Sequence, residues 1–248
     1  MIRLKNKWRF TAAFMAAGIL LAVTGCSGGK QEDRVKMIQN AGVLKVAIVD
    51  TDSRYTSLDG QTPVGVEPEL VTTIAGALGV TPEYQVVSKD EAMQAVSGGL
   101  ADMAIGRING SSRLTADYQL STSYGKGFFY AVTKKGDYTL TVGAFEDSNV
   151  GVDRGLDEDS RTQLYRASGV TVNEYGSAEA AAADIKDGRI RAYICYEDQA
   201  KELLEDSGLQ VQNVTNLKPE EFVILTGKGD ATLANGINVL VRQFLEKE

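Results

Sequence analysis

Short apolar runs of strand length alternate with helix-length segments over residues 34–105, and no other feature restricts the fold of this chain as strongly. The expected strands cover residues 43–49, 84–87 and 101–105, and the expected helices cover residues 34–40, 69–78 and 89–96. Helices that alternate with strands at these lengths favour a parallel sheet covered on both faces. Because ligands bind at the carboxyl ends of such strands, we expect a binding site in the loops that follow them.

A second group of strands and helices begins after residue 127. Its expected strands cover residues 128–133, 149–152, 190–196 and 209–214, and its expected helices cover residues 157–167, 178–185 and 197–204. A short strand over residues 222–225 and a helix over residues 233–244 follow. This order predicts a second α/β unit after the first. The expected fold is therefore α/β with two lobes, each a mostly parallel sheet flanked by helices.

The strand over residues 101–105 runs into a polar loop that carries Arg107 and Arg113 among glycine, asparagine and serine residues. An arginine grips a carboxylate through two parallel hydrogen bonds, and small residues leave backbone N–H groups open to a ligand. The loop therefore suits the capture of a carboxylate. A solvated loop whose arginines pair with surface acids fits the same residues.

The first 26 residues have the pattern of a lipoprotein signal. Four basic residues precede an apolar run over residues 10–23, which ends at Thr24, Gly25 and Cys26. This run is shorter than the roughly 20 residues that a spanning helix needs, and Val-Thr-Gly-Cys is a lipobox. We expect removal of residues 1–25, lipidation of Cys26 at the extracytoplasmic face of the cell membrane, and a flexible tether over residues 26–33. A plain transmembrane anchor is the alternative.

Composition excludes several classes of function. Loss of residues 1–25 removes four basic residues and no acidic ones, so the net charge falls from −7 to −11, and such a surface repels nucleic acid. The chain contains no histidine, which excludes Ser-His-Asp catalysis, Cys-His catalysis and zinc sites built on histidine. With Cys26 lipidated, Cys195 would be the only free cysteine, and we expect it to be a buried apolar residue. We expect no metal and no cofactor, while catalysis by carboxylates alone stays open.

Several of these segments together resemble the extracellular solute-binding proteins of amino-acid ABC transporters, bacterial family 3. The resemblance rests on GVLKVAI at residues 42–48, GGLADMAI at 98–105, SSR at 111–113 and QLSTSY at 119–124. It covers nearly all of the chain after residue 33. It implies a periplasmic-binding-protein-like fold of type II, with lobe 1 formed by residues 34–126 and 219–248 and lobe 2 by residues 127–218. In such a fold lobe 2 is inserted into lobe 1, and the two chain crossings form a two-segment hinge. It also implies a monomer that captures an amino acid or related carboxylate by lobe closure and delivers it to ABC permease subunits.

The resemblance further implies which residues bind the ligand. Arg113 falls within one position of the family arginine that holds the α-carboxylate, and Tyr55 lies where the family places an aromatic ring against the ligand. Tyr196 stands where the family has the acid that binds the α-ammonium, so Glu197 or Asp198 would have to supply that charge. The candidate ligand-binding residues are Arg113, Asn109, Gly106, Arg107, Tyr55, Asp52, Gly155, Tyr196 and Glu197.

Two other functions stay open at this point. The first follows from the resemblance, which implies that some relatives of this fold dehydrate small carboxylic acids with acidic residues in the cleft. A carboxyl group with a strongly raised pKa in the cleft would favour such an enzyme. A sensory or vestigial module that binds another protein is the other alternative, and an exposed apolar patch on one lobe would favour it. We expect a binding protein and no enzyme.

Overall fold

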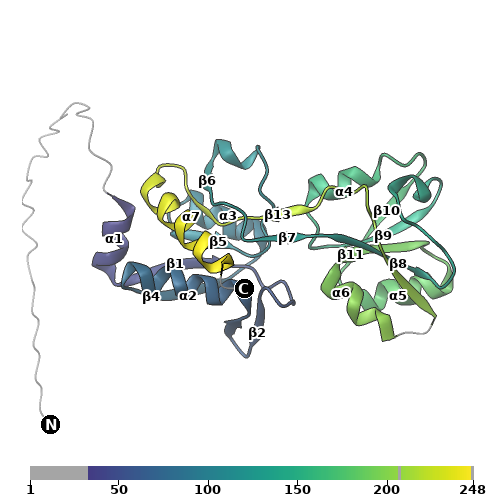
Figure 1. Cartoon of the computed structure of the whole chain (residues 1–248), viewed down its shortest axis with the longest axis horizontal. Helices are drawn as coiled ribbons and strands as arrows, with labels where there is room; N and C mark the ends of the chain where they lie inside the picture. The colour runs from purple at the N-terminus through teal and green to yellow at the C-terminus, as the bar shows by residue number, and fades with distance from the viewer. Residues whose placement is uncertain (1–32, 206–207, 247–248) are drawn as a thin grey trace, which may run out of the picture. The chain divides into compact units, whose positions relative to one another are not determined.

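The structure, a computed structural model, describes residues 33–205 and 208–246. This part of the chain contains two five-stranded sheets and two short two-stranded ladders (Figure 1). The expected signal peptide and the lipidation site Cys26 lie outside the described residues. No helix within the described ranges is long and apolar enough to cross a membrane.

The first sheet has the strand order β4-β1-β5-β14-β6. Strand β1 (Val43–Ile48), the second in this order, pairs in parallel with β4 (Thr81–Val86) and with β5 (Met103–Ile105). The sheet is mixed, because β14 (Leu225–Gly227) runs antiparallel to both β5 and β6 (Tyr118–Leu120). The expectation of a parallel sheet is therefore correct for three of the five strands.

Four helices pack against the first sheet. They are α1 (Arg34–Ala41), α2 (Val66–Leu78), α3 (Lys89–Ser97) and α7 (Ala231–Leu245). Buried residues of α1, α2 and α7 share one apolar cluster with Leu44, Val46 and Ile48 of β1, while those of α3 share another with Ala47. Because neighbouring side chains of a strand point to opposite faces, α3 covers the face opposite to the other three helices. Local signals set the helix ends: Ser88 and Glu91 form a capping box at α3.

The second sheet has the strand order β10-β9-β11-β8-β12. Strand β9 (Asn149–Asp153) pairs in parallel with β10 (Thr171–Tyr175) and β11 (Ala192–Tyr196), whereas β8 (Phe129–Lys134) runs antiparallel to β11 and to β12 (Leu209–Asn213). Helices α5 (Ala178–Asp187) and α6 (Glu197–Glu202) contribute buried residues to the cluster that contains Cys195. Helix α4 (Glu158–Leu164) and the 3-10 turn η2 (Val142–Phe145) cover the other face. Cys195 is fully buried, as expected.

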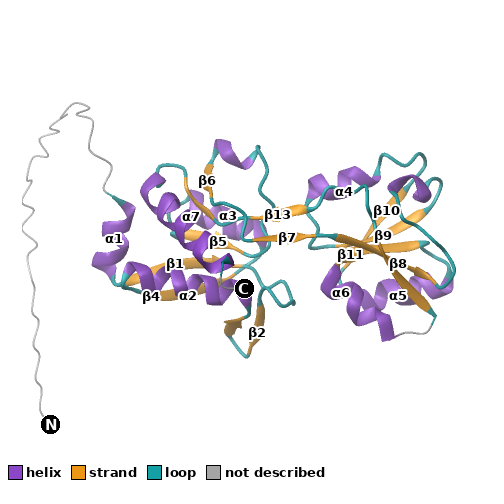
Figure 2. Cartoon of the chain, in the orientation of Figure 1, coloured by secondary structure: helices purple, strands orange, loops and turns teal. Residues whose placement is uncertain are grey.

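Short strands account for most differences from the sequence-based expectation. Strand β10 and the hairpin of β2 (Ser57–Asp59) and β3 (Thr62–Val64) were not expected (Figure 2). The run at residues 222–225, expected as one strand, divides between two ladders: Phe222 ends β13 (Glu220–Phe222) and Leu225 begins β14. The expected helix at residues 197–204 ends at Glu202 and continues as the 3-10 turn η3 (Leu203–Glu205).

Strands β7 (Gly125–Gly127) and β13 carry the chain from the first sheet to the second and back. They pair in antiparallel register, Glu220 with Gly127 and Phe222 with Gly125, and Figure 1 shows them side by side. A Cβ atom on Gly127 would lie 2.6 Å from the Tyr196 ring and 2.7 Å from the Phe222 ring, so this position requires glycine. The ladder thus brings aromatic residues of both lobes together where the chain crosses.

Candidate ligand-binding cleft

A cavity of about 840 Å³ lies between the two lobes, at the carboxyl ends of strands from both sheets. On the side of lobe 1 it is lined by residues that follow β1 and β5, with Asp52 and Gly106 among them. On the side of lobe 2 it is lined by Asp153, by Gly155 and by Tyr196, which ends β11. The expectation of a site beyond these strand ends therefore agrees with the position of the cavity. We call this cavity the cleft.

Acidic side chains outnumber basic ones along the cleft. Eight carboxylate residues line it, against four basic residues. The acids are Asp50, Asp52, Asp90, Asp153, Asp157, Glu158, Glu179 and Glu202, and the bases are Lys89, Arg107, Arg154 and Arg161. Since a cleft lined mainly by one sign of charge concentrates ligands of the opposite sign, the cleft favours a ligand that carries at least one cationic group.

Asp153 is the buried acid at the end of β9. Its carboxylate accepts hydrogen bonds from the Tyr193 hydroxyl at 3.1 Å, from Gln199 Nε2 at 2.8 Å and from the Gly155 N–H at 2.7 Å. All three donors are neutral groups. A buried carboxylate held by neutral donors on the wall of a cleft is suited to receive a ligand ammonium.

Arg107 enters the cleft from the loop after β5 with its backbone held in an uncommon conformation. Its φ is 48°, in the left-handed region that residues other than glycine rarely adopt. The Arg107 N–H donates to Glu67 Oε1 at 2.8 Å and to the Tyr124 hydroxyl at 3.2 Å. Gly106 has a φ of 141°, and a Cβ there would lie 2.4 Å from the Val49 Cβ, so the turn requires glycine before Arg107.

Glu67, in the first turn of α2, is the buried group that anchors this loop. Besides the Arg107 N–H, its carboxyl group accepts hydrogen bonds from the hydroxyl groups of Thr56 and Tyr124. Burial raises the pKa of Glu67, while the hydrogen bonds from Thr56 and Tyr124 act in the opposite direction. Burial next to Glu67 also raises the pKa of the Tyr124 hydroxyl. The carboxyl group thus connects a helix, the segment before β2 and the loop after β5.

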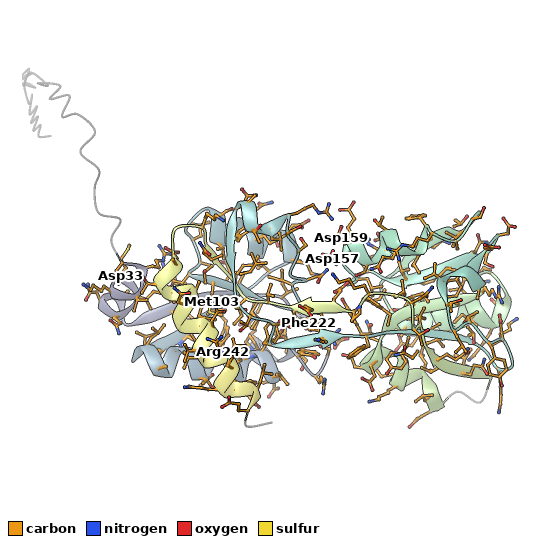
Figure 3. The ribbon with its side chains drawn as sticks, turned by 45° about the horizontal axis from the view of Figure 1, so that its top comes forward. Asp33, Met103, Asp157, Asp159, Phe222 and Arg242 are labelled. Carbon is orange, nitrogen blue, oxygen red and sulfur yellow. The ribbon has the colours of Figure 1, made fainter. Side chains whose placement is uncertain are left out.

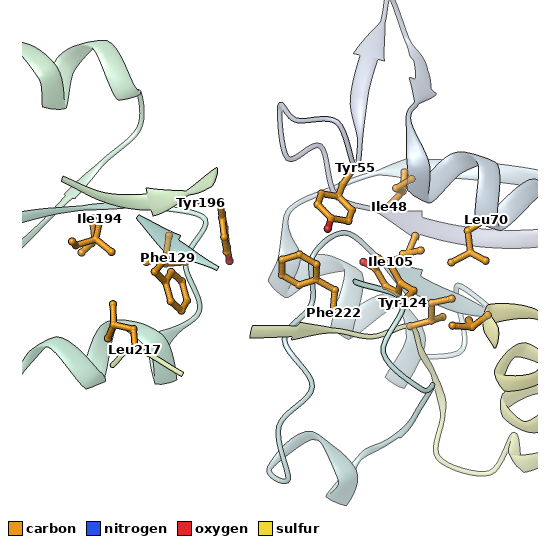
Figure 4. Packing of buried hydrophobic residues seen from close by; sticks show 14 of the residues in the cluster. Ile48, Tyr55, Leu70, Ile105, Tyr124, Phe129, Ile194, Tyr196, Leu217 and Phe222 are labelled. Carbon is orange, nitrogen blue, oxygen red and sulfur yellow. The ribbon is translucent and has the colours of Figure 1, made fainter. Parts of the chain in front are cut away.

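The Arg107 guanidinium lies among three aromatic rings. Its central carbon is 4.6 Å from the ring centre of Tyr196, 4.9 Å from that of Tyr55 and 5.9 Å from that of Phe222. Figure 4 shows the ring of Tyr196 opposite those of Tyr55 and Phe222. We call these three rings the aromatic cage. The guanidinium also forms an ion pair with Asp198 in the first turn of α6, and only 4% of Arg107 is exposed.

Tyr196 uses its ring and its hydroxyl for different contacts. The ring stacks on Phe129 at 5.8 Å and faces Arg107, whereas the hydroxyl donates to the buried carboxyl group of Glu220. Glu220 also accepts the Asp157 N–H at 2.9 Å, and burial raises its pKa. The Tyr196 hydroxyl is therefore engaged within the protein, so it does not substitute for the acid that the family resemblance places here.

The structure brings most of the candidate residues together. Five of them line the cleft: Asp52, Gly106, Arg107, Gly155 and Tyr196. A smaller cavity of about 150 Å³ is lined by Tyr55, Glu197 and Asp198, and also by Arg107 and Tyr196. Arg107 and Tyr196 thus form part of the wall that the two cavities share.

Arg113 and Asn109 lie outside both cavities. The Arg113 side chain is 65% exposed and pairs with Asp159 of α4, which Figure 3 labels. The 3-10 turn η1 (Leu114–Ala116) begins directly after Arg113. The Asn109 side-chain oxygen accepts the Glu221 N–H at 3.2 Å. The assignment of Arg113 to a ligand carboxylate stays a prediction, and the geometry favours Arg107 for that role.

Sequence reasoning missed the residues that position the site. Glu67 lies just before an expected helix and Asp153 just after an expected strand, but neither spacing nor composition marks them as buried. Glu220 lies close to the expected return of the chain to lobe 1, with no signal that links it to Tyr196. Their burial depends on contacts between residues far apart in the sequence.

Comparison with known proteins gives one family and one fold. The family model described as bacterial extracellular solute-binding proteins, family 3, matches residues 44–247. The structure is similar to AbpA of Streptococcus pneumoniae bound to L-arginine, an amino acid ABC transporter substrate-binding protein (23% identity, TM-score 0.67, 86% of this chain and 92% of that chain). It is also similar to holo ArgBP of T. maritima (20% identity, TM-score 0.68, 85% and 93%).

A third similar structure is the ancestral amino acid-binding protein AncCDT-1, described as a precursor of cyclohexadienyl dehydratase (18% identity, TM-score 0.71, 86% of this chain and 94% of that chain). At these identities the likeness shows the fold alone. The expected two-lobed α/β fold of type II is confirmed. A search of curated protein sequences gave no match.

Proposed function

We propose that this chain, which belongs to the bacterial extracellular solute-binding proteins, family 3, captures a small amino acid or a related carboxylate between its two lobes and delivers it to an ABC permease. The observation that carries the proposal is the cleft of about 840 Å³, which both lobes line at the ends of their strands. Ligand clefts of proteins fall in this range of volume, and lobe closure removes water from the buried charges. The arginine-bound state of AbpA supports an amino acid as the class of ligand.

The charges of the cleft suggest how a zwitterion binds. The α-ammonium would pair with Asp153, whose present donors are all neutral. The α-carboxylate would lie at Arg107, the most deeply buried of the basic residues that line the cleft. This arrangement replaces the Arg113 and Tyr196 positions that the family resemblance implies, and it needs no acid at residue 196.

The location follows in part from the family. Its members are described as extracellular, so the chain belongs on the extracytoplasmic side of the membrane. We propose that lipidation at Cys26 holds it there, supported by the Val-Thr-Gly-Cys sequence. Replacement of Cys26 by serine should release the protein from the membrane fraction and prevent its processing. Unchanged retention and processing would contradict the lipid anchor.

A thermal-shift screen tests the proposed function. Amino acids and related carboxylates are added to the purified protein, and a ligand that binds only the folded state raises the melting temperature. The result expected is a rise with at least one zwitterionic amino acid and a smaller rise with its deaminated counterpart. If no amino acid or carboxylate changes the melting temperature, the proposed function is wrong.

Titration calorimetry with the best ligand then tests the ammonium site. Asp153→Asn should weaken binding about 30-fold, because about 2 kcal/mol is lost when a buried charge pair loses one partner. Asp187→Asn is the matched control, since Asp187 is an exposed acid that pairs with Arg189 within lobe 2. Equal affinity in the two variants would exclude Asp153 from the site.

An enzyme on the same fold is the second candidate, and one observation favours it. Glu202 lines the cleft, and burial together with the charges of Asp198 and Asp52 raises its pKa. A carboxyl group with a raised pKa at a cleft is a candidate general acid. Incubation with cyclohexadienyl carboxylic acids, followed by detection of dehydrated product, decides between the two. Turnover that Glu202→Gln abolishes would establish the enzyme, and no turnover would leave the binding protein.

A further inference from the structure

The aromatic cage and Asp198 have the composition of a site for an organic cation. Aromatic faces attract delocalised cations such as guanidinium, and a carboxylate at the edge of the rings supplies the opposite charge. Tyr55 follows β1 in lobe 1, Tyr196 ends β11 in lobe 2, and Phe222 lies on β13 between them. The residues that would enclose a free guanidinium ligand therefore come from both lobes and from the crossing strands.

A side chain of the protein itself occupies this site. The Arg107 guanidinium lies within 6 Å of all three ring centres and pairs with Asp198. Its position is fixed from the backbone outward, because the Arg107 N–H is bonded to the buried Glu67 and Tyr124. The positive φ of Arg107 is uncommon for this residue type, and the two buried hydrogen bonds hold it in place.

One donor of the buried guanidinium has no acceptor. In the part of the chain that the structure describes, Arg107 Nε is buried and makes no hydrogen bond. Buried N–H groups without an acceptor are rare in native proteins, because each costs the desolvation of that group. The cage therefore encloses the guanidinium but leaves its Nε–H group without an acceptor. This N–H group stays available to an acceptor that reaches Arg107 from the cleft.

We propose that Arg107 is a built-in substitute for a guanidinium ligand. It extends from lobe 1 into a cage that lobe 2 completes, so it connects the two lobes when no solute is bound. It also excludes external guanidinium groups from the cage, which restricts the free ligand to the adjoining acidic cleft. Arg107 in this way determines specificity: a ligand meets a guanidinium at this wall of the cleft and cannot place its own cationic end there.

Removal of the side chain tests the proposal with a small probe. Arg107→Ala and the wild type are titrated with methylguanidinium chloride by calorimetry, and the melting temperature and the radius of gyration from X-ray scattering are measured with and without it. The variant should bind methylguanidinium at about millimolar concentration and at least about tenfold more tightly than the wild type. Its melting temperature should rise with the probe, and its radius of gyration, larger than that of the wild type, should fall.

Two control variants test whether the binding of methylguanidinium depends on the aromatic cage. Arg189→Ala removes a guanidinium that pairs with Asp184 inside lobe 2 and should respond to the probe like the wild type. The double change Arg107→Ala with Tyr196→Ala removes one wall of the cage and should abolish the gain in binding. Equal binding of methylguanidinium by Arg107→Ala and the wild type would overturn the proposal, as would an undiminished gain in the double variant.

If Arg107→Ala does not fold, the radius of gyration of the variant Asp198→Ala tests the proposed connection between the lobes. Asp198 is partly exposed, and its loss breaks the ion pair between the lobes while the cage stays intact. The radius of gyration should then exceed that of the wild type, and an unchanged value would overturn the connection between the lobes. The proposed function is independent of this result, because it fails only if the wild type binds no amino acid or carboxylate.

Discussion

Two arginines at the ends of one loop, Arg107 and Arg113, lie in opposite environments. Arg107 is buried, with its backbone N–H bonded to Glu67 and its guanidinium among aromatic rings. Arg113 is 65% exposed, and its partner Asp159 is 44% exposed. A guanidinium in water has many competing partners, while one enclosed by rings keeps its geometry and meets a ligand already oriented. The environment of each arginine, not its residue type, separates a candidate binding group from a surface ion pair.

The strongest test of this contrast removes the anchor of Arg107. Glu67→Ala leaves the buried hydroxyl groups of Thr56 and Tyr124 without their acceptor, and it leaves the Arg107 N–H with the Tyr124 hydroxyl alone. We expect the free energy of unfolding to fall by about 3 kcal/mol or more, since each unsatisfied buried group costs about 1–3 kcal/mol. Denaturant unfolding measures this loss. A fall below about 1 kcal/mol would mean that the loop does not depend on Glu67.

The next effect concerns the ring that faces Arg107. Tyr196→Phe keeps the ring and deletes the hydroxyl that donates to the buried Glu220. We expect a loss of about 1–3 kcal/mol in the free energy of unfolding, with the cage unchanged. The double variant with Glu220→Gln should lose less than the sum of the two single changes, because the two groups interact. Additive losses in this cycle would show that the hydrogen bond contributes little.

The dependence of stability on pH offers a third test, which compares the buried Glu67 with the exposed ion pair of Arg113 and Asp159. Burial raises the pKa of Glu67 above its ordinary value of 4.5, so the folded state binds more protons than the unfolded state above that pH. This contribution to stability is fully present below pH 4.5 and is lost as pH rises through the raised pKa. Each unit by which the pKa is raised corresponds to about 1.4 kcal/mol.

Unfolding free energies measured from pH 4 to pH 8 for the wild type and for Glu67→Gln check this prediction. The variant should lose less stability than the wild type over this interval, since glutamine does not titrate. Asp159→Asn, at the exposed pair, should follow the wild type. A wild type whose stability rises with pH more steeply than that of Glu67→Gln would reverse the sign and contradict the raised pKa.

The smallest effect is expected at Arg113. Arg113→Ala removes an exposed ion pair and should lower the free energy of unfolding by less than about 1 kcal/mol, with ligand affinity unchanged. The family resemblance alone predicts a different result, a loss of about 2–5 kcal/mol in binding when a buried carboxylate loses its arginine. Calorimetric titration of the variant decides. A loss of that size would return the carboxylate site to Arg113 and remove the contrast with Arg107.

Sequence patterns predicted the strands and helices better than the contacts between them. Apolar runs identified most strands of both sheets, and the expected starts of the helices at residues 34 and 89 agree with the observed starts of α1 and α3. The antiparallel direction of β14 and the division of residues 220–227 between two ladders carry no local signal. Strand direction in a short apolar run depends on which neighbour the chain meets, and that neighbour is distant in the sequence.

The candidate site likewise has features that the sequence determines and features that only the folded chain determines. The sequence by itself determined the family, the order of most strands and helices, and a loop that carries Gly106, Arg107 and Arg113. Only the tertiary structure decided which arginine is buried, because the carboxyl group of Glu67, the ring of Tyr196 and the carboxylate of Asp198 reach Arg107 from 40, 89 and 91 residues away. Periodicity reports which face of an element is apolar, whereas the enclosure of a charge depends on groups that only the folded chain brings within a few ångströms.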